Sequence, residues 1–250
     1  MSSHPAAASW HGSARIGLGW GLFVGHAGDH RPHAHHAVQI VLSETPQRLW
    51  TPDQGWQLCH GAVIGPDVLH RLDQSSAPVT MLYLEPDSPD GRRAISNLAS
   101  SWRALTAKET ASALAVLRAS PGAPDVSRVV DRLSLGAMSE RETLQGDALI
   151  ESLIAALPQA LPGRLGSASL AARAGLSASR LQHRFRAHTG LALRPYLRWR
   201  RLLTALDAVG RGRSLTDAAF EAGFADAAHF TRTLRRHFGI TPRVLLHLRT

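Results

Sequence analysis

An internal repeat in the last third of the chain constrains the fold more than any other feature. The stretch LAARAGLSASRLQHRFRAHTGLA, at Leu170–Ala192, is similar to TDAAFEAGFADAAHFTRTLRRHFGIT, at Thr216–Thr241. In each copy a short helix ends at Ala-Gly, a turn follows, and a second helix ends at another glycine. Two short helices joined by a tight turn form a helix-turn-helix. The repeat therefore predicts two such units in one helical domain.

Each copy contains the same three kinds of marker residue. A glycine able to adopt positive φ ends the first helix, a Ser or Asp caps the second, and two apolar residues spaced i, i+4 pack inward. In chain order these residues are Gly175, Ser177, Leu181 and Phe185, and then Gly223, Asp226, Phe230 and Leu234. Gly190 and Gly239 should end the second helices. Arg194–Val209 is long enough to form one helix that connects the two units.

Charge is concentrated in the same part of the chain. Residues 161–250 hold 16 Arg and 4 acidic residues, a net charge of +12, whereas residues 1–160 have a net charge of −3. A basic block with helical periodicity is typical of a protein that binds a polyanion. An arginine-rich solvated surface is the alternative, but it does not explain the scarcity of acidic residues.

The remaining bulk features describe an ordinary globular protein. No apolar run is long enough to span a bilayer, and Met1–Trp10 lacks the pattern of a secretion signal. Cys59 is the single cysteine, which excludes an internal disulfide and fits a reducing compartment. The sequence therefore predicts a cytoplasmic protein with no membrane partner.

The second copy, with SLTDAAFEAGFADAAHFTRTLRRHFGITP, resembles the signature of the AraC/XylS family of bacterial transcription regulators. The resemblance runs from Ser167 to about Leu248. It implies two helix-turn-helix units in successive major grooves of double-stranded DNA, and contact with RNA polymerase if the protein is an activator. The sequence departs from the pattern in the first unit, where GLALRP replaces the Gly-x-Ser/Thr-Pro ending. It also departs at Ala227 and Ala228, where small side chains predict weaker base readout by the second unit.

The exposed faces of the two second helices supply the expected DNA contacts, because Arg and Gln suit bidentate contacts with G and A. The residues expected to contact bases are Ser179, Arg180, Gln182, His183, Thr231, Arg232 and Arg235. The residues expected to contact the phosphate backbone are Arg200, Arg201, Arg213 and Arg236.

The first 160 residues predict a different architecture. Strand-like runs bounded by Pro, Gly and Asp occur at Ala37–Ser43, Gly61–Pro66 and Val79–Pro86, and indicate an antiparallel barrel or sandwich. Helical periodicity follows at Ala94–Leu105, Glu109–Ser120 and Thr143–Leu161. The expected fold class is α+β, with domains at residues 1–90, 91–160 and 161–250 and a linker at Pro158–Gly163. The apolar stripe of the last helix predicts either a homodimer or packing on the barrel, through Leu144, Leu149, Leu153, Ile154 and Leu157.

Histidines dominate the segment before the first of these strands. The positions of His33, His35 and His70 resemble the two halves of a cupin barrel, whose metal-binding members also use a Glu that Glu44 matches poorly. The sensor domain common in AraC-type regulators is such a barrel without metal. Three interpretations stay open: a divalent metal site, a small-molecule effector site, or structural histidines.

These features favour a transcription regulator that is not an enzyme and that responds to an effector, a small molecule or a metal, in its N-terminal barrel. A metal-cupin enzyme with a basic localisation domain is the second hypothesis. A constitutive DNA-binding protein whose barrel is only a scaffold is the third.

Overall fold

The computed structural model forms two compact units. It describes residues 10–27, 32–73, 77–86, 88–96, 98–120, 122–133, 147–160, 167–238, 240–242 and 244. The first, here the sheet unit, comprises Met1–Pro86, Asp90–Ser139 and Arg235–Thr250. The second, here the helical unit, comprises Asp87–Pro89 and Glu140–Leu234.

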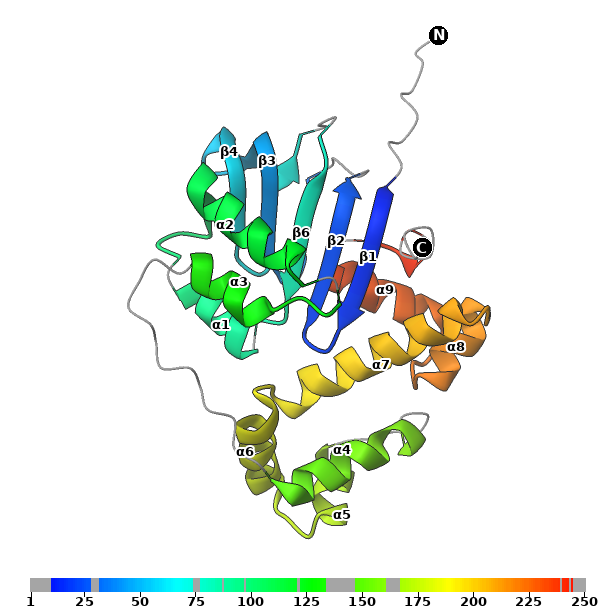
Figure 1. The fold of residues 1–250 in the computed structure, drawn as a ribbon. Coiled ribbons are helices and arrows are strands. Elements are labelled where there is room, and N and C mark those ends of the chain that lie inside the picture. Colours follow the sequence, from blue (N-terminus) through cyan, green and yellow to red (C-terminus); the bar gives the residue numbers. More distant parts are fainter. Residues whose placement is uncertain are drawn as a thin grey trace. The chain divides into compact units, whose positions relative to one another are not determined.

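An antiparallel sheet is the centre of the sheet unit (Figure 1). Its described strands are β1 His11–Gly17, β2 Trp20–His26, β3 Val38–Thr51, β4 Gly55–Ile64, β5 Arg71–Leu72, β6 Val79–Leu84 and β7 Trp102–Leu105. Their order is β1-β2-β6-β3-β4-β7, and β5 pairs with β3. The three predicted strands are therefore confirmed as parts of β3, β4 and β6, and the α+β class is confirmed.

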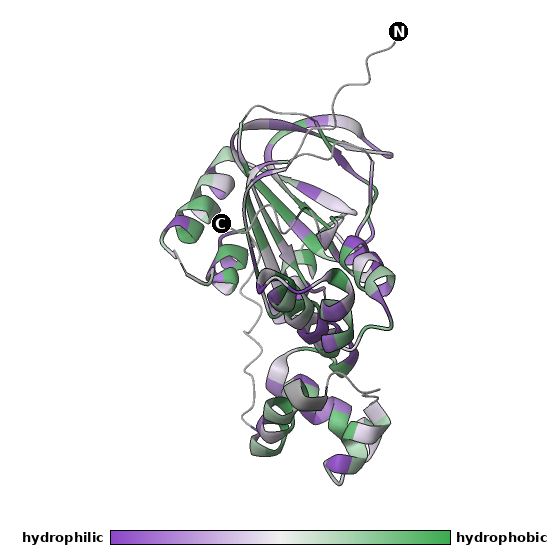
Figure 2. Ribbon diagram, turned by 90° about the vertical axis from the view of Figure 1, so that its right-hand side faces the viewer, coloured by the Kyte–Doolittle hydropathy of each residue, from purple (hydrophilic) through white to green (hydrophobic). Residues whose placement is uncertain are grey.

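Alternation along the central strands separates two faces of the sheet. Val38, Ile40 and Leu42 of β3 belong to the hydrophobic core that α2 Ala107–Arg118 and α3 Val126–Leu133 also line. In Figure 2 the strands of the sheet are largely green, the colour of hydrophobic residues, which agrees with the burial of these side chains. Gln39, the residue between Val38 and Ile40, points to the opposite face. There its side chain contacts Tyr83 of β6, and this face holds the histidine cluster.

One predicted helix is wrong in its second half. The first helix after the sheet, α1, covers Pro89–Ser96, whereas residues 102–105 of the predicted helix form β7. This strand pairs with β4, with Leu105 opposite Gly61 and Trp102 opposite Ile64. The pairing buries Trp102 and Leu105, so tertiary contacts override the helical spacing of the sequence. The next predicted helix agrees with α2, which begins with a capping box formed by Thr106 and Glu109.

The helical unit contains the expected repeat. Its described helices are α4 Ala148–Ala160, α5 Ser167–Arg173, α6 Ala178–Thr189, α7 Leu193–Gly210, α8 Leu215–Glu221 and α9 Ala227–Phe238. The connecting helix is confirmed as α7. The last four residues of α9, from Arg235 onward, belong to the sheet unit.

The apolar stripe of α4 packs inside the helical unit. Ile150 and Leu157 are buried in a core with Leu181 and Phe185 of α6, and Leu153 and Ile154 pack against that core. The described part of the stripe thus packs against neighbouring helices of its own unit. Leu144, Gly239 and residues 161–163 of the predicted linker lie outside the described residues.

Candidate nucleic-acid interface and histidine cluster

The first helix-turn-helix unit is formed by α5 and α6, and its predicted markers are confirmed. Gly175 has a φ of +62° after the end of α5. Ser177 caps α6, because its Oγ accepts a hydrogen bond from the Arg180 backbone N–H at 3.3 Å. Gly190 ends α6 in the left-handed conformation with a φ of +72°. Leu181 and Phe185 point inward and are buried.

The second unit, formed by α8 and α9, repeats this construction. Gly223 has a φ of +78°. Asp226 Oδ1 accepts a hydrogen bond from the His229 backbone N–H at 2.5 Å and thereby caps α9. Phe230 and Leu234 are fully buried. Both units therefore hold a second helix rigidly by one face and leave the opposite face free.

The open face of α6 presents the predicted residues. Ser179, Arg180, Gln182 and His183 are all exposed. Their neighbour Arg184 is used differently, since its Nε and one terminal nitrogen donate to the two carboxylate oxygens of Asp147, each at 2.7 Å. Hydrogen bonding by Arg184 lowers the pKa of Asp147 below its usual value. The sequence did not predict this pair, which joins α6 to the N-terminal cap of α4.

On α9 the predicted contact residues are accessible to different degrees. Arg232, Arg235 and Arg236 are exposed, and Thr231 is half-buried. Ala228 is exposed and Ala227 half-buried, so the start of α9 presents only small side chains. Arg213, in the turn before α8, is exposed. These positions suit DNA contacts, which remain predictions.

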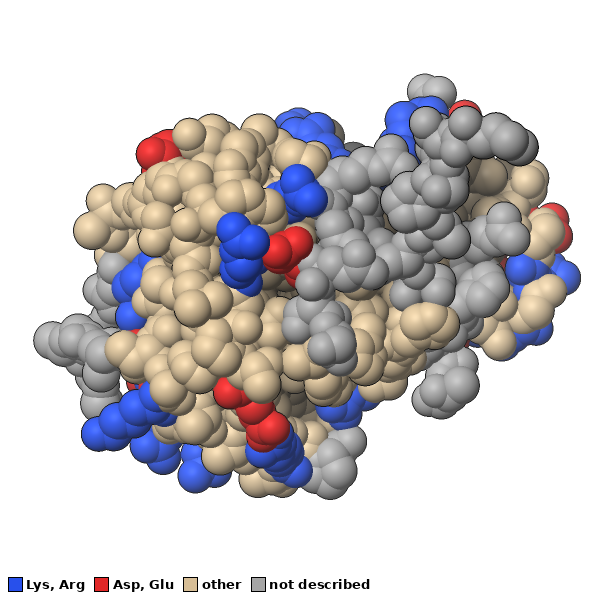
Figure 3. All heavy atoms as spheres, turned by 90° about the horizontal axis from the view of Figure 1, so that it is seen from above, with Lys and Arg blue, Asp and Glu red and all other residues tan. Residues whose placement is uncertain are grey.

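Two of the predicted phosphate contacts are less available than the sequence indicated. Arg200 and Arg201 of α7 are half-buried, and their Nε atoms are buried without a hydrogen-bond partner among the described residues. Burial lowers the pKa of Arg201. On the face that Figure 3 shows, Lys and Arg side chains form small separate groups, several of them beside Asp or Glu. The arginines that the sequence predicted to contact phosphate therefore differ in exposure.

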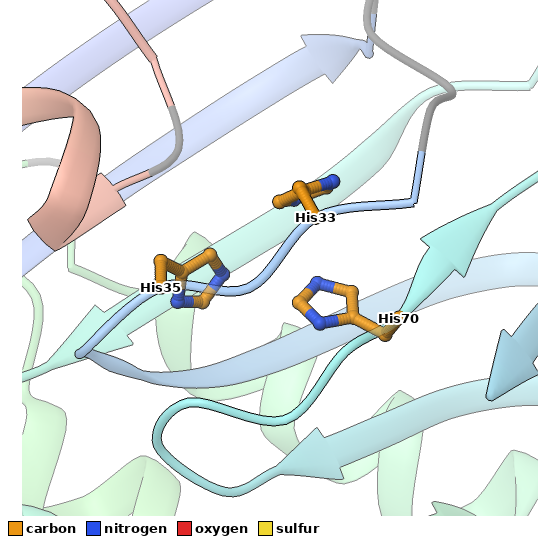
Figure 4. A group of neighbouring side chains, drawn as sticks. All are labelled: His33, His35 and His70. Carbon is orange, nitrogen blue, oxygen red and sulfur yellow. The ribbon is translucent and has the colours of Figure 1, made fainter. Parts of the chain in front are cut away.

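In the sheet unit, the structure brings the three predicted histidines together (Figure 4). The ring centroids of His33 and His70 are 4.6 Å apart, and those of His35 and His70 are 5.1 Å apart. The backbones of His33 and His70 exchange two hydrogen bonds of 3.0 Å, which fix the segment before β3 against the segment before β5. One ligand nitrogen of each ring lies within 4.8 Å of the others. His35 and His70 are buried, whereas His33 is half-buried.

Backbone carbonyl groups orient two of the rings. His70 Nδ1 lies 2.9 Å from the Val68 carbonyl oxygen, so Nδ1 carries the proton and donates it. His70 Nε2 then has a lone pair, is buried, and has no hydrogen-bond partner in the described part of the chain. His35 Nδ1 lies 3.0 Å from the Ala37 carbonyl oxygen and His35 Nε2 lies 3.1 Å from Gln39 Oε1, so acceptor atoms face both nitrogens of this ring.

The environment of the cluster keeps these rings neutral. Burial, followed by the neighbouring His33, lowers the pKa of His35 to about 4. Burial, followed by His35 and His33, lowers the pKa of His70 to about 3. Below the rings, Gln39 contacts His35 Nε2 at 3.1 Å and the Tyr83 hydroxyl at 3.3 Å. Both rings are therefore uncharged near neutral pH, which is the form that binds metals.

Glu44 does not join the cluster. It lies in β3 with its side chain exposed, and it pairs with Arg118 of α2. Glu44 therefore does not take the place of the glutamate that metal-binding cupins use. Among the described residues, the cluster consists of histidines alone.

The segment after His35 also holds the last turn of α9. The His36 backbone N–H donates to the Arg236 carbonyl at 2.9 Å, and the Ala37 backbone N–H donates to the His237 carbonyl at 3.4 Å. The buried carboxylate of Glu85 lies 3.2 Å from His237 Nε2 and 3.7 Å from His36 Nε2. These contacts join residues of one compact unit. No local sequence signal predicted them.

A separate cavity of about 230 Å³ lies elsewhere in the sheet unit. Apolar residues of β2, β3 and α2 line it, including Leu22, Leu42 and Leu114, and Arg15 and Arg118 are at its edge. Its volume is below the range of about 300–1,000 Å³ usual for small-molecule sites. The histidine cluster is therefore the more specific of the two candidate ligand sites.

Comparison with known proteins identifies the helical repeat. Residues 170–247 match a family model described as a helix-turn-helix domain. The HTH-type transcriptional activator RhaS of Escherichia fergusonii is 35% identical over 114 residues, which cover 44% of this chain and 41% of RhaS. The Klebsiella pneumoniae protein of the same name is 33% identical over 103 residues, which cover 41% of this chain and 37% of that protein. The match thus spans about two fifths of the length of these relatives.

A solved structure is similar over more of the chain. The crystal structure of ToxT from Vibrio cholerae aligns with 93% of this chain and 98% of its own, at 9% identity and a TM-score of 0.49. None of the described helices is long and apolar enough to cross a membrane. The repeated helix-turn-helix geometry agrees with the matched relatives, which are transcription regulators and not enzymes, so the enzyme hypothesis is set aside. Residues 170–247 therefore form a helix-turn-helix domain similar to that of the transcriptional activator RhaS, in agreement with the AraC/XylS resemblance of the sequence.

Proposed function

We propose that the whole protein is a sequence-specific transcription regulator whose α6 and α9 enter successive major grooves of its operator. One observation carries this proposal: the two helix-turn-helix units repeat the same glycine turns, caps and buried apolar pairs. Each unit fixes its second helix by the inner face and leaves polar side chains on the outer face. A rigid helix with such a face is the element that reads base edges in the major groove.

The two reading helices contribute differently in this proposal. On α6, Arg180 and Gln182 carry side chains suited to guanine and adenine edges. On α9, Arg232 and Arg235 are available, but the first two residues are the small Ala227 and Ala228. The first unit therefore supplies most of the base discrimination. Arg213 and Arg236, both exposed, supply phosphate contacts.

The sheet unit supplies regulation. A ligand bound in this unit shifts an equilibrium only if its affinity differs between two arrangements of the protein. The backbone segment after His35 is suited to this role, because it holds both a ring of the histidine cluster and the last turn of α9. An effector at the cluster would therefore change how firmly α9 is held.

The experiment is an operator selection with the full-length protein, followed by fluorescence anisotropy on the selected duplex. We expect Arg180→Ala to lower the affinity at least about 5-fold, a loss of about 1 kcal/mol or more. Arg132→Ala is the matched control, because Arg132 is an exposed arginine on α3, outside the helix-turn-helix units. Equal losses for both variants, or an affinity that does not fall with rising salt, would contradict specific DNA binding through α6.

A further inference from the structure

We propose that His33, His35 and His70 form a binding site for one divalent transition metal ion, and that this ion is the ligand to which the regulator responds. The site itself stands on the geometry of the sheet unit alone. Its regulatory role rests on the proposed function.

The distances allow coordination after a small adjustment. Three nitrogen atoms separated by at most 4.8 Å share a point no more than about 2.8 Å from each of them, while a Zn–N bond needs about 2.0–2.1 Å. Each nitrogen therefore has to move inward by less than about 0.8 Å. Ring rotation can supply such a shift without moving the backbone, which the two hydrogen bonds between His33 and His70 hold in place.

The protonation pattern is the one that metal-binding histidines show. Such a histidine usually donates the N–H of its second ring nitrogen to a backbone carbonyl or carboxylate. His70 does this through Nδ1 to Val68, which leaves Nε2 buried, unprotonated and without a partner among the residues that the structure describes. A buried polar atom without a partner destabilises the folded state, and a metal ion bound there would remove that destabilisation. His35 differs, because its Nδ1 faces the Ala37 carbonyl and its Nε2 faces Gln39 Oε1, so metal binding at Nε2 would replace the hydrogen bond to Gln39 Oε1.

The ligand set selects the class of metal. Neutral imidazoles suit zinc, copper, nickel and cobalt, whereas magnesium and calcium require oxygen ligands. The cluster contains no carboxylate among the described residues. Three protein ligands leave a fourth position open, and half-buried His33 marks the side from which the ion enters.

The position of the site explains how an ion could act on DNA binding. His35 is followed directly by the two residues whose backbone N–H groups hold the Arg236 and His237 carbonyls. The His35 carbonyl in turn accepts a hydrogen bond from the Asp67 backbone N–H at 2.8 Å. Coordination of His33 and His35 would fix the backbone just before His36 and Ala37. It would thereby also fix the two backbone N–H groups that bind the last turn of α9.

The first experiment measures metal binding directly. Untagged full-length protein is stripped with a chelator and titrated with Zn²⁺ against a fluorescent competitor, and bound metal per chain is determined by mass spectrometry. We expect one tightly bound ion per chain, with an affinity at least about 100-fold lower in His70→Gln and in His33→Gln. His60→Gln is the matched control, because His60 is a half-buried histidine on β4 of the same unit, outside the cluster.

Folding of the variants is checked separately. His33 is only half-buried, so its replacement is the variant that keeps the sheet intact. Zn²⁺ should raise the melting temperature of the wild-type protein and of His60→Gln but not that of His33→Gln, because only a ligand that binds the native state stabilises it. Less than one tight ion per wild-type chain, or the same affinity in His33→Gln and His60→Gln, would overturn the metal site.

The second experiment compares operator affinity with and without one equivalent of Zn²⁺. We expect Zn²⁺ to change the operator affinity of the wild-type protein by at least about 5-fold, which is the lower end of the usual range for allosteric coupling between two sites. The operator affinity of His33→Gln should not change. A tight ion that leaves operator affinity unchanged would overturn the regulatory role. Failure to bind any DNA would refute the proposed function, while the zinc titration would still decide the metal site.

Discussion

Replacing Phe230 with alanine tests the core of the second helix-turn-helix unit. The side chain of Phe230 is 0% exposed, and its ring centroid lies 5.3 Å from that of Phe224. Burial of a phenylalanine side chain contributes about 1.5–3 kcal/mol, and the cavity left by its removal adds to the loss. We therefore expect Phe230→Ala to lower the free energy of unfolding of the helical unit by about 3–5 kcal/mol.

Phe220 on α8 provides the matched control, because 74% of it is exposed. Only about a quarter of its apolar surface is buried, so Phe220→Ala should cost less than about 1 kcal/mol. Amide hydrogen exchange of peptides from residues 215–234 of the full-length protein measures local opening there, apart from unfolding of the sheet unit. Similar losses for the two variants, or a loss below about 1 kcal/mol for Phe230→Ala, would refute the assignment of this core.

Three further predictions concern single charged residues. Arg232→Ala should cost about 1–3 kcal/mol of operator affinity and relax the preference at one base pair, as measured on single-base operator variants; a loss that is uniform across all variants would make Arg232 a phosphate contact. Arg213→Ala should reduce the slope of log affinity against log salt by about 1, and an unchanged slope would exclude its phosphate contact. Burial alone would raise the pKa of Glu109, but hydrogen bonds from Arg103 and Thr106 outweigh it and lower that pKa. Its stabilising effect is therefore full above the ordinary pKa of a glutamate and is lost as the pH falls through the lowered value. Glu109→Gln, which retains the capping box, should reduce the decrease in the free energy of unfolding at acidic pH, as measured by denaturant titrations at several pH values. An unchanged pH dependence would refute the role of this carboxylate.

The helix-turn-helix repeat was predictable because its signals are local. A glycine with positive φ, a capping side chain and an i, i+4 apolar pair each act within a few residues, so the sequence alone places them. β7 shows the opposite case. Its pairing with β4 places Leu105 opposite Gly61, and no property of residues 102–105 alone predicts that pairing. Helical spacing therefore suggested the wrong element there.

The candidate sites divide in the same way. His33, His35 and His70 were found through a resemblance to the two halves of a cupin barrel, which carries information about distant parts of the chain. Arg184 and Asp147 come from different helices, and nothing close to either residue indicates the other. The partial burial of Arg200 and Arg201 had a usable signal, since Trp199 and Leu202 on either side of them are fully buried. A helical projection of α7 would have placed both arginines at the edge of its apolar face.

The ends of α6 and α9 differ, and under the proposed function this difference makes α9 the better target for regulation. α6 is closed by its own chain, because Gly190 turns left-handed and donates back to the Arg186 carbonyl. The last turn of α9 instead has its Arg236 and His237 carbonyls held by backbone N–H groups of His36 and Ala37. A change in the segment before β3 therefore acts on α9 directly, whereas α6 has no such link among the described residues. Since α9 begins with the small residues Ala227 and Ala228, the proposed function also assigns it fewer base contacts than α6. We therefore expect ligand binding to tune affinity through α9 while α6 continues to set the operator sequence.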